Sequence, residues 1–208
     1  MNIILVLFPV EFLCFTKFSR KLGKIIGSLN NVTFLSPLDH HNYIESFCVK
    51  SNRDDIEVNI FDNWKDIDFT HAIIFDDGEE FIDEIKYVKN KKIPLRIINI
   101  KITRVINIKR SNEYTANSDS ESFSYIGRGS YWGNPYSIYE VEELEEDETP
   151  RDNVIRKFKY DFENDCLLNR EQKKVFELSG KRLGCYCKPE ACHGDVIAEF
   201  LNSWDDGK

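Results

Sequence analysis

The first half of the chain alternates continuous apolar runs with segments in which apolar residues recur every three or four positions. Residues 3–8 form a continuous apolar run, as expected for a strand buried on both faces. Residues 16–29 have an apolar face at helical spacing, residues 32–35 predict a second strand, and residues 40–50 predict another helix. Strands that alternate with helices in this way indicate an α/β domain.

The clearest unit begins with an apolar strand over residues 70–75. The turn Asp76-Asp77-Gly78 follows, then a helix over residues 79–90 with acidic residues in its first turn, and then a strand over residues 93–100. A connection this short requires a right-handed crossover between parallel strands. Residues 1–110 are therefore predicted to form an open parallel sheet of Rossmann type.

Ligands of such sheets bind at the carboxyl ends of the strands, where Asp76, Asp77 and Gly78 lie. These residues can contact a ribose hydroxyl or a base, but we favour ordinary turn chemistry and capping of the next helix. The sequence contains no G-x-G-x-x-G after the first strand and no G-x-x-x-x-G-K-[ST]. Their absence argues against a dinucleotide-dependent oxidoreductase and against a P-loop NTPase.

The second half has a different character. Residues 111–121 are polar and rich in Ser and Asn, which predicts a linker between the first domain and a small α/β domain over residues 122–208. The acidic run 140–148 predicts a solvated loop or helix face, to which we assign no chemistry. The remaining predicted elements are helices over residues 150–162, 171–178 and 191–200, and a strand over residues 183–187.

The charge and the N-terminus limit the class of protein. The 208 residues carry a formal net charge of −8, which argues against an obligate duplex-DNA binder but leaves room for a single nucleotide, since that needs only one or two cations. The apolar N-terminal run has no basic residue before it, is followed by Glu11, and is too short to span a bilayer. We therefore expect a cytoplasmic protein with reduced cysteines and no membrane partner.

A glycine-rich loop over residues 125–136 is the first candidate for ligand binding. Its glycines can expose backbone N–H groups to an anion, and Arg128 adds a planar cation suited to phosphate. Trp132 can stack on a base and Asn134 can read its edge, although Trp132 can equally fill the core of a structural turn. The predicted ligand-binding residues are Gly127, Arg128, Gly129, Ser130, Trp132, Gly133 and Asn134.

A second motif gathers three of the six cysteines with one of the four histidines. Cys185 and Cys187 point to the same face of a strand, and Cys192 and His193 would complete a Cys₃His set for zinc. Against zinc, neighbouring residues at a helix start diverge by about 100°. Alternatively, Cys192 is a nucleophile activated at a helix N-terminus, His193 transfers a proton, and Asp195 orients the imidazole or a sugar hydroxyl. A third interpretation is purely structural packing.

Residues 127–135 and 183–195 match, in order, the two sequence blocks of a domain family found in phages and bacteria, domain of unknown function 4326. Residues 122–203 thus resemble that family, which implies a compact α/β domain whose two motif loops meet at one pocket, and a viral origin. Residues 1–110 resemble Rossmann-like nucleotide-sensing proteins related to nucleoside deoxyribosyltransferases, without their glycine-rich phosphate motif.

These observations predict a protein directed at a nucleotide-like small molecule. Glycosyl or ADP-ribosyl transfer, or hydrolysis at a nucleoside bond, would fit the two motifs. One alternative is a non-catalytic phage protein that sequesters a nucleotide or a host protein, and another is a zinc-stabilised interaction module. A viral protein of either kind would act in the host cytoplasm.

Overall fold

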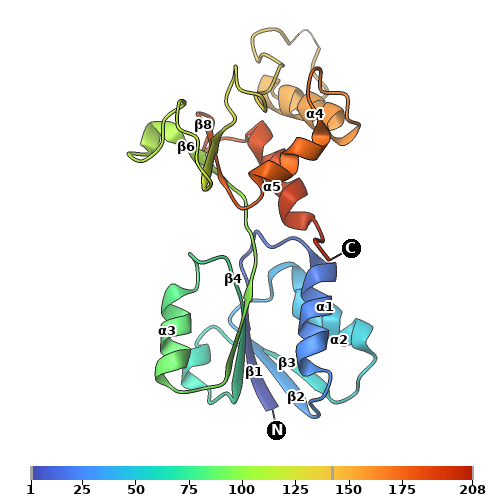
Figure 1. Cartoon of the computed structure of the whole chain (residues 1–208). Helices are drawn as coiled ribbons and strands as arrows, with labels where there is room; N and C mark the ends of the chain where they lie inside the picture. Colours follow the sequence, from blue (N-terminus) through green and yellow to red (C-terminus); the bar gives the residue numbers. More distant parts are fainter. Residues whose placement is uncertain (1, 142, 208) are drawn as a thin grey trace. The chain divides into compact units, whose positions relative to one another are not determined.

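The computed structural model describes residues 2–141 and 143–207, and these residues form two compact units (Figure 1). Unit 1 contains the residues up to Lys101 and those from Ser203 on, and unit 2 is Ile102–Asn202. Each unit is built on a parallel sheet, which confirms the predicted α/β class. In the described part of the chain, no helix has both the length and the apolar character that crossing a membrane requires.

Unit 1 has a five-stranded sheet in the order β3-β2-β1-β4-β5. All neighbouring strands are parallel, and the order reverses between β1 and β4, as in doubly wound sheets. The edge strand β3 was not predicted because exposed and half-buried residues make up its whole length. The strands are β1 (Asn2–Leu7), β2 (Val32–Ser36), β3 (Ile56–Ile60), β4 (His71–Asp76) and β5 (Leu95–Asn99).

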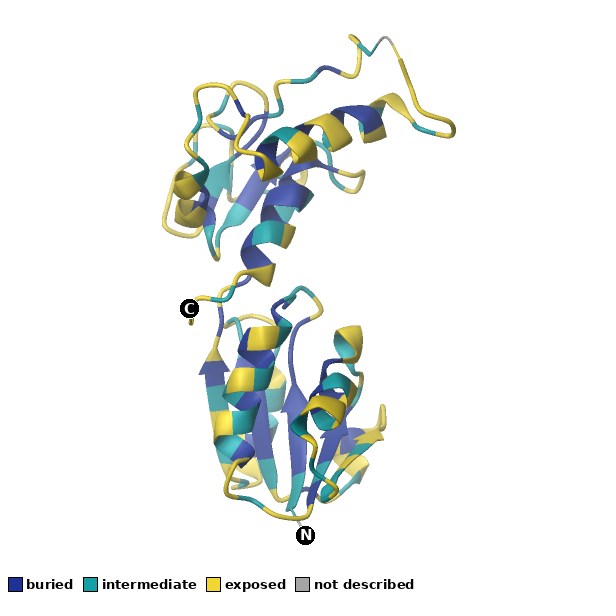
Figure 2. Cartoon of the chain, turned by 90° about the vertical axis from the view of Figure 1, so that its right-hand side faces the viewer, coloured by how far each residue is buried: buried dark blue, intermediate teal, exposed yellow. Residues whose placement is uncertain are grey.

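Three helices cover this sheet: α1 (Phe15–Ile26), α2 (Tyr43–Ser51) and α3 (Ile82–Asn90). Figure 1 shows α1 and α2 on one face and α3 on the other, so the middle strands are buried on both sides (Figure 2). This double burial is the physical reason for the continuous apolar runs in the sequence. On the α1 face, Phe18 packs against Phe75 with ring centroids 5.1 Å apart.

Unit 2 has a three-stranded parallel sheet in the order β6-β8-β7. Its strands are β6 (Arg104–Asn107), β7 (Phe123–Tyr125) and β8 (Arg182–Cys185), so the last strand in the sequence is the middle one. The predicted domain boundary at residue 110 therefore lies later than the division between the units, because β6 pairs with β8. The predicted linker packs onto this sheet as well, since the ring of Tyr114 stacks on Phe123 at 4.3 Å.

The helices of unit 2 complete its core. α4 (Pro150–Glu163) begins with a capping box between Thr149 and Asp152, and α5 (His193–Ser203) follows the Cys–His motif. The predicted helix over residues 171–178 is a 3-10 helix, η4 (Gln172–Leu178). The core joins one face of α4 to the sheet and α5, and its fully buried members include Phe158, Phe162, Leu183 and Ile197.

Candidate functional site

Unit 2 contains a cavity of about 230 Å³ that is lined by residues from both sequence motifs and from α4. The glycine-rich loop and its continuation supply one wall, the first turns of α4 supply another, and the Cys–His motif supplies the third. The lining residues are Arg128, Asn134, Tyr136, Ile138, Tyr139, Arg151, Val154, Ile155, Cys185, Cys187, Ala191, Cys192 and His193.

Close backbone approach shapes the glycine-rich loop. A Cβ atom on Gly133 would lie 2.5 Å from the carbonyl oxygen of Gly127. Only glycine at position 133 therefore allows these two backbone segments of the loop to lie in contact. Gly129 has a φ of +86°, which also favours glycine. The N–H of Ser130 donates to Gly127 O at 3.1 Å, and the N–H of Gly133 donates to Ser130 O at 3.1 Å. These two N–H groups therefore hold the loop together and are not offered to an anion.

Two arginines from different elements line the cavity. Arg128, on the exposed part of the loop, donates one hydrogen bond to the carbonyl oxygen of Tyr136 at 3.4 Å. Arg151, in the first turn of α4, donates one to the carbonyl oxygen of Ala191 at 3.2 Å. A guanidinium carries five N–H donors, so each side chain keeps donors for an anion. The sequence motifs indicated Arg128 but not Arg151, whose only local signal is its place at a helix N-terminus.

Trp132 is not among the residues that line the cavity. Its side chain is 6% exposed and belongs to the core, where its ring lies 6.3 Å from that of Phe162. The structure thus gives Trp132 the core-filling position that was the alternative to base stacking. Tyr136 and Tyr139 supply the aromatic surface of the cavity instead. A hydrogen bond from Tyr136 to the Asp161 carboxylate, together with burial, raises the pKa of Tyr136 to about 12.

Asn134 fixes the loop to α4. Its side-chain amide donates to the carbonyl oxygen of Val154 at 3.0 Å, and its side-chain oxygen accepts from the N–H of Tyr136 at 2.9 Å. The side chain still borders the cavity. Its acceptor is therefore engaged inside the protein, and one of its two amide hydrogens is the group it can offer to a ligand.

The Cys–His motif brings its sulfur and nitrogen atoms into one cluster. Cys185 and Cys187 have their Sγ atoms 3.5 Å apart, and Cys192 Sγ lies 3.7 Å from His193 Nδ1. The ligand atoms of Cys185, Cys192 and His193 all lie within 4.8 Å of one another. The expectation that Cys192 and His193 diverge is wrong, because α5 begins at His193 and Cys192 precedes the helix. The rotation of 100° per residue does not apply there.

His193 is buried, and a hydrogen bond at Nε2 holds its ring. Nε2 lies 2.9 Å from the carbonyl oxygen of Ile126, and the ring packs edge-on against Phe158 at 5.0 Å. Since a carbonyl oxygen only accepts, Nε2 carries the hydrogen. Burial lowers the pKa of His193, which favours the neutral imidazole. Nδ1 is then the nitrogen with a free lone pair, and it is the one that faces Cys192.

Cys192 does not have the lowered pKa expected of an activated nucleophile. Its contacts with Cys185 and Cys187, and then its burial, raise the pKa of the Cys192 thiol. Contacts with Cys185 and Cys192 lower the pKa of Cys187 instead, and Arg151 adds to that effect. Cys187 lies on the half-buried side of the cluster, whereas Cys185 and Cys192 are buried.

Asp195 caps the start of α5. Its carboxylate accepts a hydrogen bond from the N–H of Cys192 at 3.0 Å and forms an ion pair with Lys188 at 2.7 Å. The nitrogens of His193 contact Ile126 and Cys192, so the imidazole is oriented by those groups and not by the carboxylate. Asp195 thereby positions the helix end that carries the motif.

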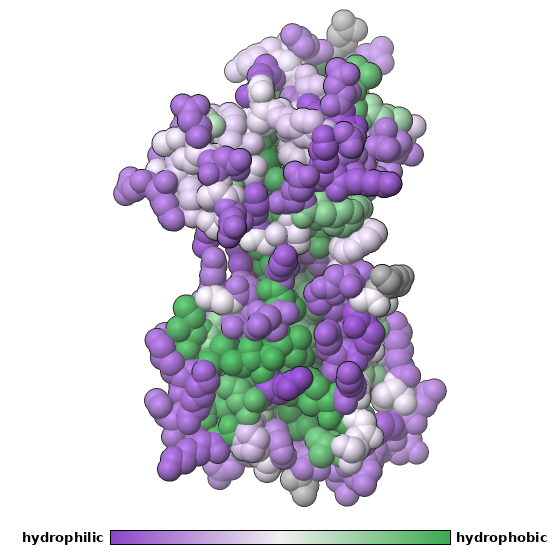
Figure 3. Space-filling model, viewed as in Figure 1, coloured by the Kyte–Doolittle hydropathy of each residue, from purple (hydrophilic) through white to green (hydrophobic). Residues whose placement is uncertain are grey.

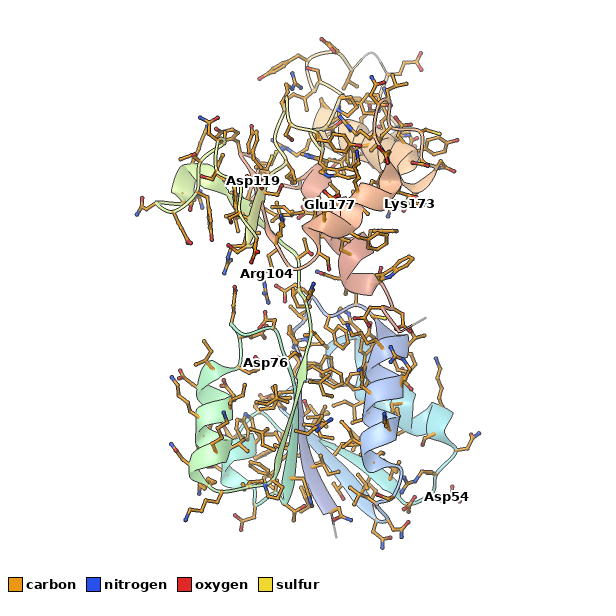
Figure 4. The ribbon with its side chains drawn as sticks, in the orientation of Figure 1. Asp54, Asp76, Arg104, Asp119, Lys173 and Glu177 are labelled. Atoms are coloured by element: carbon orange, nitrogen blue, oxygen red, sulfur yellow. The ribbon has the colours of Figure 1, made fainter. Side chains whose placement is uncertain are left out.

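The carboxyl ends of the strands in unit 1 show the turn chemistry that we favoured. Asp76, labelled in Figure 4, accepts from the N–H of Gly78 at 3.1 Å. Asp77 accepts from the N–H groups of Glu79 and Glu80, each at 3.0 Å. These carboxylate oxygens thus bind the turn that leads to α3.

A groove of about 560 Å³ lies between α1 and the edge strand β5 of unit 1. Figure 3 shows apolar side chains gathered on one face of this unit. As far as the structure describes the lining of the groove, it consists of aliphatic side chains, Asn99 and three basic residues: Lys21, Lys24 and Arg96. The cavity in unit 2 has cations, aromatic rings and thiols together, so it is the stronger candidate.

Comparison with known proteins divides the chain in a similar way. The family model of the minimal SLOG domain (mSLOG) matches residues 1–106, and that of the domain of unknown function (DUF4326) matches residues 106–203. The second match confirms the resemblance carried by the two motifs. An "Uncharacterized 12.4 kDa protein in nrdA-td intergenic region" of Enterobacteria phage T4 is 37% identical over 92 residues, which is 44% of this chain and 74% of that protein. No solved structure matches the chain.

Proposed function

The chain belongs to the minimal SLOG domain family over residues 1–106 and to the DUF4326 family over residues 106–203, and on this basis we propose that it binds a nucleotide-derived ligand. SLOG domains are associated with such ligands, and since the SLOG match covers unit 1, only the cavity itself supports the place of the site in unit 2. In our proposal the cavity of unit 2 holds the phosphorylated part of the ligand. The supporting observations are the charge, shape and chemistry of the cavity lining.

Convergence of Arg128 and Arg151 on one cavity is the observation that carries the proposal. The chain as a whole has a net charge of −8, whereas this one concave surface carries two guanidinium groups. Guanidinium groups bind phosphate oxygens through pairs of parallel hydrogen bonds. The two arginines come from different elements, so they can contact the same phosphate from two directions.

The remaining lining suits a base or a sugar. Tyr136 and Tyr139 offer aromatic faces, and Ile138, Val154 and Ile155 offer apolar contact. The volume of about 230 Å³ is below the ~300–1,000 Å³ of typical ligand pockets. A mononucleotide, or one nucleotide of a larger molecule, therefore fits the proposal better than an enclosed dinucleotide.

Binding of the ligand without a covalent step is the function that this geometry supports best. The buried Cys192 with its raised pKa weighs against the predicted nucleophile, and the engagement of Asp195 at the helix end weighs against the predicted orienting carboxylate. A protein of this kind would sequester its ligand. The phage relative supports a place of action inside an infected host cell.

A second candidate function is transfer or hydrolysis at a nucleoside bond, including glycosyl and ADP-ribosyl transfer. It is favoured by Cys187 and His193, which border the same cavity as the arginines and can move protons. Chromatography of the nucleotide after prolonged incubation separates the two candidates. Release of a free base supports transfer or hydrolysis, whereas recovery of the intact nucleotide supports binding.

Isothermal titration with a nucleoside, its monophosphate and ADP-ribose tests the proposal. We expect the phosphorylated compounds to bind and the nucleoside to bind at least about tenfold more weakly, because hydrogen bonds to charged groups contribute about 1.5–3 kcal/mol. Arg128→Ala and Arg151→Ala should each lower the affinity for the monophosphate by a similar factor.

Arg156→Ala is the matched control for these variants. Arg156 lies on α4 like Arg151, but it pairs with Glu148 at 2.7 Å and does not line the cavity. Its loss should leave the affinity unchanged. Equal binding by the two cavity variants and the control, or no nucleotide binding by the unmodified protein, would contradict the proposal.

A further inference from the structure

We propose that Cys185, Cys187, Cys192 and His193 bind one Zn²⁺ ion in the wall of the cavity. The four side chains come from the end of β8, the loop after it and the start of α5. This inference goes beyond ligand binding and does not depend on it. Its basis is the geometry of the cluster, the hydrogen bond of His193 and the charge beside Cys187.

Cys185, Cys192 and His193 have their ligand atoms within 4.8 Å of one another, Cys187 joins them through Cys185, and two pair distances in the cluster are those of zinc ligands. With Zn–S bonds of about 2.3 Å and Zn–N bonds of about 2.0–2.1 Å at tetrahedral angles, two sulfurs lie about 3.8 Å apart, and a sulfur and a nitrogen about 3.6 Å. The structure has Cys185 and Cys187 Sγ 3.5 Å apart and Cys192 Sγ 3.7 Å from His193 Nδ1. The sulfur pair is far longer than the ~2.0 Å of a disulfide, and all three cysteines are free.

His193 is already oriented as a metal ligand. Its Nε2–H donates to the carbonyl oxygen of Ile126, which leaves the lone pair of Nδ1 facing the thiols. Histidines that bind metals typically donate their other ring N–H to a carbonyl or carboxylate in this way, because the hydrogen bond fixes both the tautomer and the ring. A histidine that served only to cap α5 would not need Nδ1 at the sulfur cluster.

Charge balance supports Cys187 as the fourth ligand. Zn²⁺ with three thiolates and a neutral imidazole carries a net charge of −1. Arg151 and Cys187 line the same cavity, so the guanidinium can supply the compensating positive charge. With Cys187 at the half-buried edge of the cluster and the other three ligands buried, the ion would be closed off by protein on most sides.

Such an ion would tie the middle strand of the sheet to α5. The described part of unit 2 has only a three-stranded sheet and four helical elements, two of them short 3-10 helices, so a bond network between β8 and α5 would stabilise it substantially. It would also fix the wall that the Cys–His motif contributes to the cavity. The metal would then have a structural role, with no open coordination position.

Elemental analysis of the full chain, purified without a polyhistidine tag or chelator, tests the proposal. We expect one zinc per chain. Cys185→Ser and Cys192→Ser should lose most of it, whereas Cys166→Ser, at an exposed cysteine outside the cluster, should retain it. Zinc-free protein with all six thiols titratable would overturn the proposal, and so would a disulfide within the cluster.

Cobalt replacement gives a second readout in the unmodified protein, in case the serine variants do not fold. Co²⁺ in place of Zn²⁺ should show the d–d bands of a tetrahedral site and thiolate charge-transfer absorption, and Cys187→Ser should reduce the latter by about a third. An octahedral spectrum, or unchanged charge transfer in Cys187→Ser, would contradict the four-ligand site. Arg128→Ala should leave the zinc content unchanged, so failure of nucleotide binding and failure of zinc binding are distinguishable.

Discussion

Replacement of Gly133 by alanine tests how the glycine-rich loop holds Arg128. The added Cβ would lie 2.5 Å from Gly127 O and 3.2 Å from Arg128 Cα. Real Cβ contacts essentially never fall below 3.0 Å, so the backbone must move by at least about 0.5 Å, the difference between these distances. Because the neighbours are backbone atoms, no side-chain rotation can relieve the clash. Overpacking of this kind costs about 1–3 kcal/mol.

Thermal unfolding followed by circular dichroism, together with nucleotide titration, measures both consequences of Gly133→Ala. A loss of 1 kcal/mol lowers the melting temperature of a domain of 60–100 residues by about 4–8 °C. We also expect weaker nucleotide binding, because the displaced backbone carries Arg128 with it. Gly23→Ala, in α1, is the control, since its Cβ would meet the Phe47 ring of α2 at an ordinary 3.6 Å. An unchanged melting temperature in Gly133→Ala would refute the reasoning.

Three further changes probe the fold. Asn202→Ala should destabilise unit 2 by about 2–4 kcal/mol in urea unfolding. The Asn202 side chain accepts from the N–H of buried Thr103 at 2.8 Å and donates to its carbonyl oxygen at 3.0 Å, and the variant loses both bonds. An unchanged midpoint of the urea transition would speak against this pairing. Hydrogen bonds from Arg156 and then from Asn153 lower the pKa of Glu148 from 4.5 to about 2, so the stability that Glu148 contributes is present above pH 4.5 and lost as the pH falls toward 2. Glu148→Gln should flatten the decline in this window, and an identical pH profile would count against it. Phe158→Ala, at a fully buried ring, should cost about 3–5 kcal/mol in the same assay, and a loss below 1 kcal/mol would show that the ring is not core.

The sheet of unit 1 was predictable because its middle strands are buried on both faces and therefore appear as continuous apolar runs. β1 and β4 are of this kind, and the helix between β4 and β5 fixed the parallel direction. β6 and β7 were not predicted, since they are three or four residues long and mostly half-buried. They gain their partners only from β8, far along the chain.

The site could be predicted in part. The two motifs drew attention to Arg128 and the Cys–His cluster by their density alone. Arg151 and Tyr139 lie between the motifs and have no motif of their own, so only the fold brings them to the cavity. Trp132 was a candidate for both the core and the ligand site. The sequence could not decide between them, because only the residues packed around Trp132 show that it lies in the core.

Nuclear magnetic resonance of the arginine side chains can establish whether Arg128 and Arg151 bind phosphate together. The Nε–Hε signals of the full chain would be followed during titration with a nucleoside monophosphate and, separately, with the nucleoside. We expect the signals of Arg128 and Arg151 to shift with the monophosphate alone, while that of Arg156, held by Glu148, stays in place. Shifts of the same size for the nucleoside, or none at either cavity arginine, would contradict a phosphate site in unit 2.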